Sequence, residues 1–157
     1  MLEIEVPGWR SLQLEHLVLD VNGTLTRDGN LLPGVKARIA DLKLVLTVCL
    51  LSADTFGRLD GVAAELGVQS ARLRRGEPEA PQKAEVVKRL GTSRVAAIGN
   101  GANDVDMLRD AALGIAVLGP EGLATPALLA ADVVVGSVDD GLDLLLNSKR
   151  LIATLRR

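Results

Sequence analysis

The chain has 157 residues and a formal net charge of −2, with 48% hydrophobic and 24% charged residues. This length suffices to bury a core and the composition is that of a soluble globular protein, so we expect one domain over residues 1–157. The near-neutral charge and the 1% aromatic content exclude the basic, base-stacking surface of a nucleic-acid-binding protein. No apolar run reaches the roughly 18 residues of a membrane span. The lone Cys49 indicates a reducing compartment, so we expect a cytoplasmic protein with no membrane partner.

The first fifteen residues alternate apolar and polar side chains in two short runs, 2–6 and 12–15, on either side of Pro7-Gly8. Alternation with a period of two around a turn predicts an N-terminal β-hairpin. Residues 16–20 follow as an apolar run that predicts a buried strand, and Asp28-Gly29 then predicts a tight turn.

From residue 16 onward, strand and helix signals alternate along the chain. Apolar runs predict further strands over residues 44–51, 68–73, 94–98, 113–118 and 132–135. Helical spacing and capping signals predict helices over residues 35–42, 56–66, 82–90, 102–112 and 125–130, and a C-terminal helix opened by Ser137. This alternation predicts an α/β fold with a doubly wound, mainly parallel sheet and helices on both faces. Residues 1–15 would form the hairpin and residues 16–157 the α/β core.

A single carboxylate ends the first buried strand, because Asp20 is followed directly by the turn-forming residues Asn22, Gly23 and Thr24. Ligands of open α/β sheets bind beyond the carboxyl ends of the strands. A carboxylate there serves as a nucleophile, as a metal ligand, or only as the end of a strand that runs into a turn. This motif by itself leaves the three interpretations open.

Three further segments lie at strand ends or helix starts: Ser52, Lys83 and residues 99–104. Each has an ordinary interpretation by itself, with Ser52 as a helix N-cap and Lys83 as a solvated helix lysine. Residues 99–104 have the glycines of a dinucleotide-binding loop, but Asp104 occupies the position of the third glycine of G-x-G-x-x-G. A dinucleotide site is therefore disfavoured.

Together these residues meet the chemical demands of phosphoryl transfer. Asp20 supplies a carboxylate nucleophile that forms an acyl phosphate. Ser52, Lys83 and loop amides supply donors for the phosphate oxygens. Oxygen ligands at Asp20 and in residues 100–104 suit a hard cation such as Mg²⁺.

The order of these segments resembles the four motifs of the haloacid dehalogenase-like hydrolase superfamily. The matching segments are, in order, residues 20–26 (DVNGTLT), Ser52, Lys83 and residues 99–104 (GNGAND). Within the superfamily, the chain resembles the phosphorylation domain of P-type cation pumps and its soluble relatives. Residues 81–87, 114–117 and 131–134 carry that closer resemblance.

The resemblance implies a role for each matching residue. The catalytic residues would be Asp20 as nucleophile, Lys83, and Asn22 at the acid–base position; phosphate would be bound by Ser52, Lys83, Gly23 and Thr24. The metal ligands would be Asp20, the backbone carbonyl of Asn22, Asn100 and Asp104, with Asn103 orienting that shell.

Two residues depart from the phosphatase pattern. Relatives usually have an acid–base aspartate where this chain has Asn22, and a metal-binding aspartate where it has Asn100. General acid–base help contributes about 10²–10⁴ in rate, so we expect slow hydrolysis or a long-lived acyl phosphate. The alternative is a catalytically weak or inactive phosphate-binding, regulatory module of the same fold.

The spacing of the motifs leaves no room for a cap domain, so the chain resembles capless members of the superfamily. In those, a neighbouring subunit or a large substrate closes the site. We therefore expect a phosphorylated small molecule or a phosphoprotein as substrate, and a homo-oligomer that closes the site. A receiver-type switch shares the aspartate, hydroxyl and lysine, but its phosphorylated aspartate follows an earlier acidic pair, and no such pair precedes Asp20.

Overall fold

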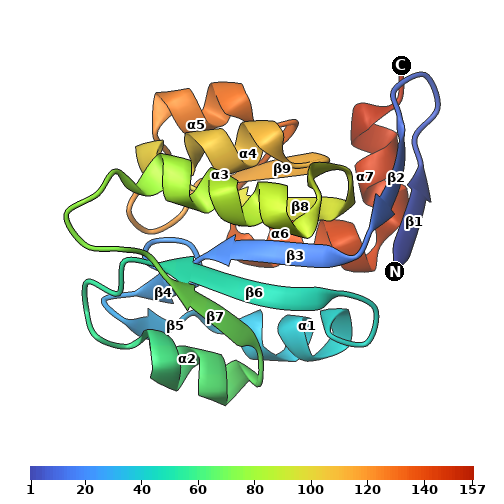
Figure 1. The fold of residues 1–157 in the computed structure, drawn as a ribbon. Coiled ribbons are helices and arrows are strands. Elements are labelled where there is room, and N and C mark those ends of the chain that lie inside the picture. The colour runs from blue at the N-terminus through green and yellow to red at the C-terminus, as the bar shows by residue number, and fades with distance from the viewer.

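A six-stranded parallel sheet forms the centre of the computed structural model, which describes all 157 residues (Figure 1). Its strand order is β10-β9-β8-β3-β6-β7, and every neighbouring pair is parallel. The strands are β3 (His16–Asp20), β6 (Thr47–Ser52), β7 (Gln69–Arg72), β8 (Val95–Gly99), β9 (Leu113–Val117) and β10 (Val133–Val135). This sheet confirms the doubly wound, parallel architecture expected from the alternating strand and helix signals.

Helices cover both faces of the sheet, which explains why its central strands are apolar on both sides. The buried apolar residues form two core clusters, one on each face of the sheet. Helices α3, α4 and α5 pack against the smaller cluster, and α1, α2, α6 and α7 pack against the larger one (Figure 1). Their bounds are α1 (Val35–Leu42), α2 (Leu59–Leu66), α3 (Glu79–Leu90), α4 (Val105–Asp110), α5 (Thr125–Ala130), α6 (Val138–Leu146) and α7 (Ser148–Leu155). Short 3-10 turns, η1 (Thr92–Arg94) and η2 (Ala102–Asp104), precede β8 and α4. None of these helices combines the length and apolar character that crossing a bilayer requires.

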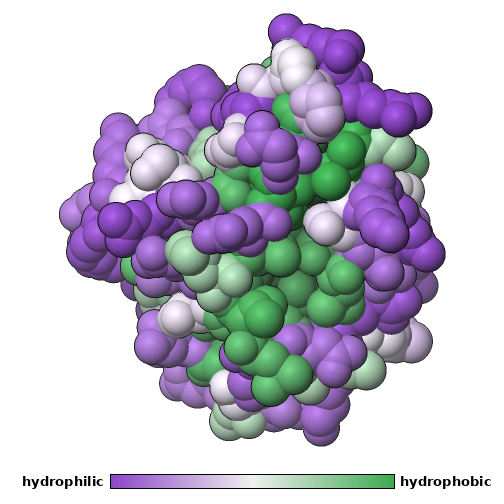
Figure 2. All heavy atoms as spheres, turned by 90° about the vertical axis from the view of Figure 1, so that its right-hand side faces the viewer, coloured by the Kyte–Doolittle hydropathy of each residue, from purple (hydrophilic) through white to green (hydrophobic).

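Two small antiparallel hairpins accompany the main sheet. The predicted N-terminal hairpin is formed by β1 (Leu2–Glu5) and β2 (Ser11–Leu14), and its alternate residues Ile4 and Leu12 join the larger core cluster. The predicted turn at Asp28-Gly29 joins β4 (Thr26–Arg27) to β5 (Asn30–Leu31), a flap near the end of β3. Figure 2 shows a continuous apolar area on the face next to the N-terminal hairpin.

Several predicted boundaries were wrong, each for a local reason. Residues 44–46 turn at the end of α1 through the amides of Leu44, Val45 and Leu46, so β6 begins only at Thr47. Leu44 is 82% exposed, although its apolar character had suggested a strand. The helix predicted over residues 56–66 begins at Leu59, because Asp54 and Gly57 have positive φ and form a turn.

Three further differences concern α3, the helix predicted over residues 102–112 and the C-terminal helix. Helix α3 begins at Glu79 rather than at residue 82, because Pro81 is tolerated in a first turn, where its missing N–H has no partner to lose. The helix predicted over residues 102–112 splits into η2 and α4. The single C-terminal helix is interrupted at Asn147, whose φ and ψ are −125° and 68°, while Ser137 caps α6 as predicted.

The strand order reverses direction at β3, which lies between β6 and β8. In open α/β sheets, the crevice at such a switch point is where ligands bind. Asp20 ends β3 and Asn100 follows β8, so both lie at this crevice.

Candidate active site

A small polar cavity of about 180 Å³ opens at this switch point. Its lining residues come from the loops after β3, β6, β8 and β9 and from the start of α3. Five of them were singled out from the sequence: Asp20, Asn22, Ser52, Asn100 and Asn103. The structure thus gathers residues that are up to 83 positions apart around one opening.

Behind the cavity wall, Lys83 is fully buried and contacts two carboxylates. Its Nζ lies 2.7 Å from Oδ1 of Asp20 and 2.6 Å from Oδ1 of Asp104. Burial raises the pKa of Asp20 to about 6, against the opposing attraction of the Lys83 ammonium. Burial works against the charge on Lys83, but the two carboxylates outweigh it and raise the pKa of this lysine. Lys83 is therefore a fixed cation, not a solvated helix lysine.

Asp104 uses both of its oxygens within the protein. Oδ1 accepts from Lys83, and Oδ2 accepts from the backbone amides of Asn100 at 2.9 Å and Gly101 at 2.8 Å. A side-chain carbon at Gly99 would lie 2.5 Å from the Asp104 carboxylate, which explains a glycine there. These contacts tie Asp104 to Lys83 and to the loop after β8, and its role as a metal ligand, which the resemblance implies, stays a prediction.

Thr24 connects Asp20 to Asn100 beneath the cavity. Its Oγ lies 3.1 Å from Oδ2 of Asp20 and 3.0 Å from Oδ1 of Asn100, and the threonine is fully buried. A hydroxyl has one proton, so it donates to only one of these two oxygens. The other oxygen receives no proton from Thr24 and keeps its electron pairs for another partner.

Ser52 lines another part of the cavity wall, where a hydrogen bond fixes its side chain. Its Oγ accepts from the amide of Asp54 at 2.8 Å, which leaves its own proton free to donate, and lies 3.5 Å from Nδ2 of Asn22. Asp54 has a φ of 59° and pairs with Arg72 at 2.8 Å, so the turn that carries Ser52 is fixed by its own ion pair. The serine is 3% exposed and lines the cavity.

Two glutamates in the cavity wall were not identified from the sequence. Glu79 starts α3 and accepts from Nδ2 of Asn103 at 2.5 Å. Glu121 lies in the turn after β9, and its carboxylate packs on Gly23, whose φ of 77° also favours glycine. Both lie in segments expected to be loops, and nothing in their local sequence distinguishes them from other exposed acids.

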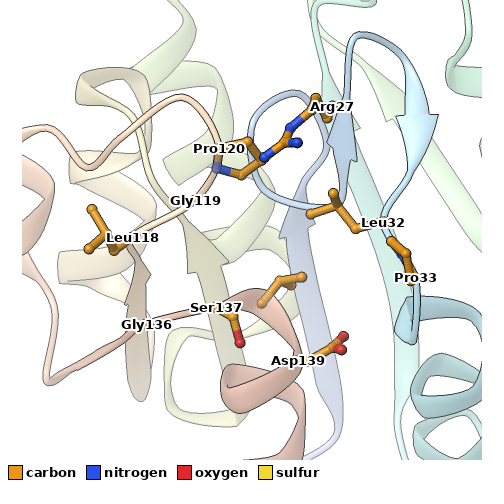
Figure 3. A pocket seen from close by; sticks show the side chains of 10 residues that line it. Arg27, Leu32, Pro33, Leu118, Gly119, Pro120, Gly136, Ser137 and Asp139 are labelled. Carbon is orange, nitrogen blue, oxygen red and sulfur yellow. The ribbon is translucent and has the colours of Figure 1, made fainter.

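A larger cavity of about 390 Å³ lies on the side of the Gly119-Pro120 turn where the flap and α6 meet (Figure 3). Arg27, Leu32 and Asp139 are among its lining residues. None of the residues singled out from the sequence lines it, so the candidate active site is the smaller polar cavity.

The donor set fits a hard divalent cation. Oδ2 of Asp20 and Oδ1 of Asn100 both lie about 3 Å from the Thr24 hydroxyl, so a carboxylate and an amide oxygen are close together, and neutral oxygens with one or two carboxylates are how proteins commonly bind Mg²⁺. No group of three or more Asp, Glu, His or Cys side chains lies close enough to share a metal ion. A metal here would therefore be bound by a mixed set of carboxylate, amide and carbonyl oxygens.

Comparisons with other proteins place this fold and this order of site residues in a known class of hydrolases. A family model of haloacid dehalogenase-like hydrolases matches residues 1–112, and the chain belongs to this family. An uncharacterized protein of Methanocaldococcus jannaschii is 47% identical over 72 residues, which are 46% of this chain and 77% of that protein.

The chain is also similar to part of a human membrane transporter. It is 37% identical over 121 residues to a phospholipid-transporting ATPase of Homo sapiens, covering 70% of this chain but only 10% of the ATPase. Among solved structures, the cobalt-bound deoxy-D-mannose-octulosonate 8-phosphate phosphatase of Haemophilus influenzae superposes with a TM-score of 0.69. It is 19% identical and covers 92% of this chain and 94% of its own, so the likeness is one of fold.

Proposed function

We propose that this protein is a magnesium-dependent phosphohydrolase that acts through a phospho-aspartate on Asp20. The observation that carries the proposal is the buried ion-paired triad Asp20, Lys83 and Asp104 at the edge of a small polar cavity. The carboxylate would act as the nucleophile, and the fixed cation beside it would attract a phosphate to the adjacent position.

In the first step, a carboxylate oxygen of Asp20 bonds to phosphorus and the bond from phosphorus to the leaving oxygen breaks. The Lys83 ammonium, 2.7 Å from Asp20, would offset charge on the phosphoryl oxygens, and the free Ser52 proton would be donated to one of them. In the second step, water attacks phosphorus, which releases phosphate and restores the Asp20 carboxylate.

Asn22 limits the rate in this scheme. Its side chain lines the cavity and lies 3.5 Å from Ser52, where an acid–base group would face the leaving oxygen. An amide neither gives up a proton to the leaving oxygen nor takes one from water. Both protons would then have to be exchanged with solvent, so slow turnover or a long-lived acyl phosphate is the expected behaviour.

The charges around the cavity favour a cation requirement. Asp20, Glu79 and Glu121 line it, and the Lys83 charge is already shared by two carboxylates. A phosphate dianion would be repelled by such a wall. Mg²⁺, held by Asp20, Asn100 and the carbonyl of Asn22, would supply the positive charge that draws the phosphate in and stabilises charge in the transition state.

We further propose a phosphorylated small molecule or a phosphoprotein as substrate. No cap covers the cavity, so closure would come from the substrate itself or from a second subunit of a homo-oligomer in the cytoplasm. The β4–β5 flap is the local element near the end of β3 that would border such a substrate.

The test is magnesium-dependent hydrolysis of p-nitrophenyl phosphate by the wild type and Asp20→Asn. We expect hydrolysis by the wild type that EDTA abolishes, and none by the variant. Mass spectrometry of wild type quenched in acid should show a phosphate adduct on the peptide that contains Asp20. Absence of both hydrolysis and adduct in the wild type would refute the enzyme proposal.

The amides Asn22 and Asn100 in the cavity wall also favour a second function, a phosphate-binding module without turnover. Such a module would bind beryllium fluoride or phosphate and show no catalysis. The same purified protein, titrated with beryllium fluoride by calorimetry, distinguishes the two functions.

A further inference from the structure

The turn that follows β9 is attached to the candidate active site at several points. The amide of Gly122 donates to the carbonyl of Gly119 at 3.0 Å, which closes the turn. Nδ2 of Asn100 donates to the carbonyl of Gly122 at 3.1 Å, and the amide of Ala124 donates to the carbonyl of Asn100 at 2.9 Å. Gly119 packs so closely on the Gly23 carbonyl that a side chain there would collide with it.

This attachment places Glu121 in the cavity wall with its carboxylate against Gly23. A side-chain carbon at Gly23 would collide with Oε2 of Glu121 and would lie 3.1 Å from Nδ2 of Asn100. Glu121 shares the cavity wall with Asp20 and Asn22. It forms no hydrogen bond or ion pair with another protein group, and the charged residues that line the cavity with it, Asp20 and Glu79, are both carboxylates.

Asn100 has two tasks that one aspartate could not perform together. Its Oδ1 lies 3.0 Å from Thr24, among the oxygens that suit a cation. Its Nδ2 holds the carbonyl of Gly122, and an aspartate has no donor with which to form that bond. The amide therefore keeps one oxygen toward the metal position and anchors the turn that brings in Glu121.

We infer that Glu121 is a metal-ligating carboxylate that takes over the charge missing at Asn100. The inference rests on the proposed magnesium dependence and assigns a further ligand to it. The cation would be held by carboxylate oxygens of Asp20 and Glu121, by Oδ1 of Asn100 and by the backbone carbonyl of Asn22. Hard divalent cations favour such an all-oxygen set.

The experiment measures metal binding without turnover. Mn²⁺ is titrated into the purified full chain and free Mn²⁺ is followed by electron paramagnetic resonance, with Mg²⁺ as competitor. Glu121→Gln is compared with the wild type and with Glu79→Gln, which removes the same charge from another residue of the cavity wall. Loss of a group that only hydrogen-bonds to a metal ligand costs about 10–100-fold in metal affinity. Glu121→Gln should therefore weaken Mn²⁺ binding by at least about tenfold. Glu79→Gln should change it by about fivefold or less.

A second variant tests whether the carboxylate of Glu121 replaces a metal-binding carboxylate at position 100. In the Glu121→Gln background, Asn100→Asp should restore about tenfold or more of the lost affinity, and in the wild-type background it should add little because it releases the turn. Equal affinities of Glu121→Gln and the wild type would overturn the inference while leaving the phosphohydrolase proposal intact. A wild type that binds no Mn²⁺ would overturn both.

Discussion

Replacing Lys83 by methionine tests how the site is held together. Methionine has a similar length but no charge, so the substitution leaves little empty space. It leaves Asp20 and Asp104 facing each other across the position of the lost ammonium, with neither more than 6% exposed. Two buried carboxylates without a cation are strongly destabilising in the folded state.

The magnitude follows from the two contacts. Coulomb's law at an effective dielectric of about 20 gives roughly 6 kcal/mol for each of the pairs at 2.7 and 2.6 Å. Removing the charges of Lys83 and its partners from water offsets much of that sum. Removal of one partner of a buried ion pair costs about 3–5 kcal/mol, and we expect Lys83→Met to lower the free energy of unfolding by this amount at pH 7.5.

The assay is urea denaturation followed by circular dichroism between pH 5 and pH 8. The pKa of Asp20, already raised to about 6 by burial, should rise further without Lys83. A raised pKa means that the folded state binds the proton more tightly than the unfolded chain does, so the variant should regain stability as the pH falls toward 5. The double variant Lys83→Met/Asp104→Asn should be more stable than Lys83→Met at pH 7.5.

Lys36→Met is the matched control, because Lys36 pairs with Glu65 at 3.8 Å on the exposed surface. Its unfolding free energy should stay within about 0.5 kcal/mol of the wild type. If Lys83→Met unfolds at the same urea concentration as the wild type, with no pH dependence of its own, the ion-paired triad does not stabilise the site and the reasoning fails.

Two further substitutions test the cavity and the buried contacts of α3. Asn22→Asp places a proton carrier in the cavity wall and should speed p-nitrophenyl phosphate hydrolysis by up to about 10²–10⁴-fold; an unchanged rate would show that the leaving oxygen does not face residue 22. Gln82 is buried and bonds the backbone of Arg74 through both ends of its amide, at 2.7 and 3.1 Å. Gln82→Leu leaves these backbone groups unpaired and should lower the free energy of unfolding by about 1–3 kcal/mol in urea denaturation, whereas an unchanged midpoint would mean that water replaces the amide.

The architecture could be predicted from the sequence because its signals are local and repeated. Leu17, Val18 and Leu19 of β3 are apolar and fully buried, as the centre of a strand with helices on both sides must be, and helix α1 was predicted at its observed bounds. One error falls where an apolar stretch contains a turn that its side chains do not signal. Leu44 illustrates this, since no local pattern separates an exposed leucine at a helix end from the first residue of a strand.

The site could be predicted in part, because four of its segments have characteristic residues at strand ends. The contacts of Asp104 could not, since they depend on which donors surround each oxygen, and these come from Lys83, Asn100 and Gly101. Glu121 was missed for a related reason. Its position depends on a turn that approaches Gly23 only in the folded chain, about 100 positions away in sequence.

The place of β3 in the middle of the sheet has a consequence for how the protein fluctuates. Strand β3 is paired on both sides, with β6 and β8, so its amides exchange with solvent only when the whole sheet opens. The turn that carries Glu121 is held by a few hydrogen bonds beyond the end of β9, so we expect it to open at a lower free energy than the sheet. Asp20, at the end of β3, would thus keep its position while this turn opens. A cation or a phosphate could then enter and leave the cavity without any unfolding of β3.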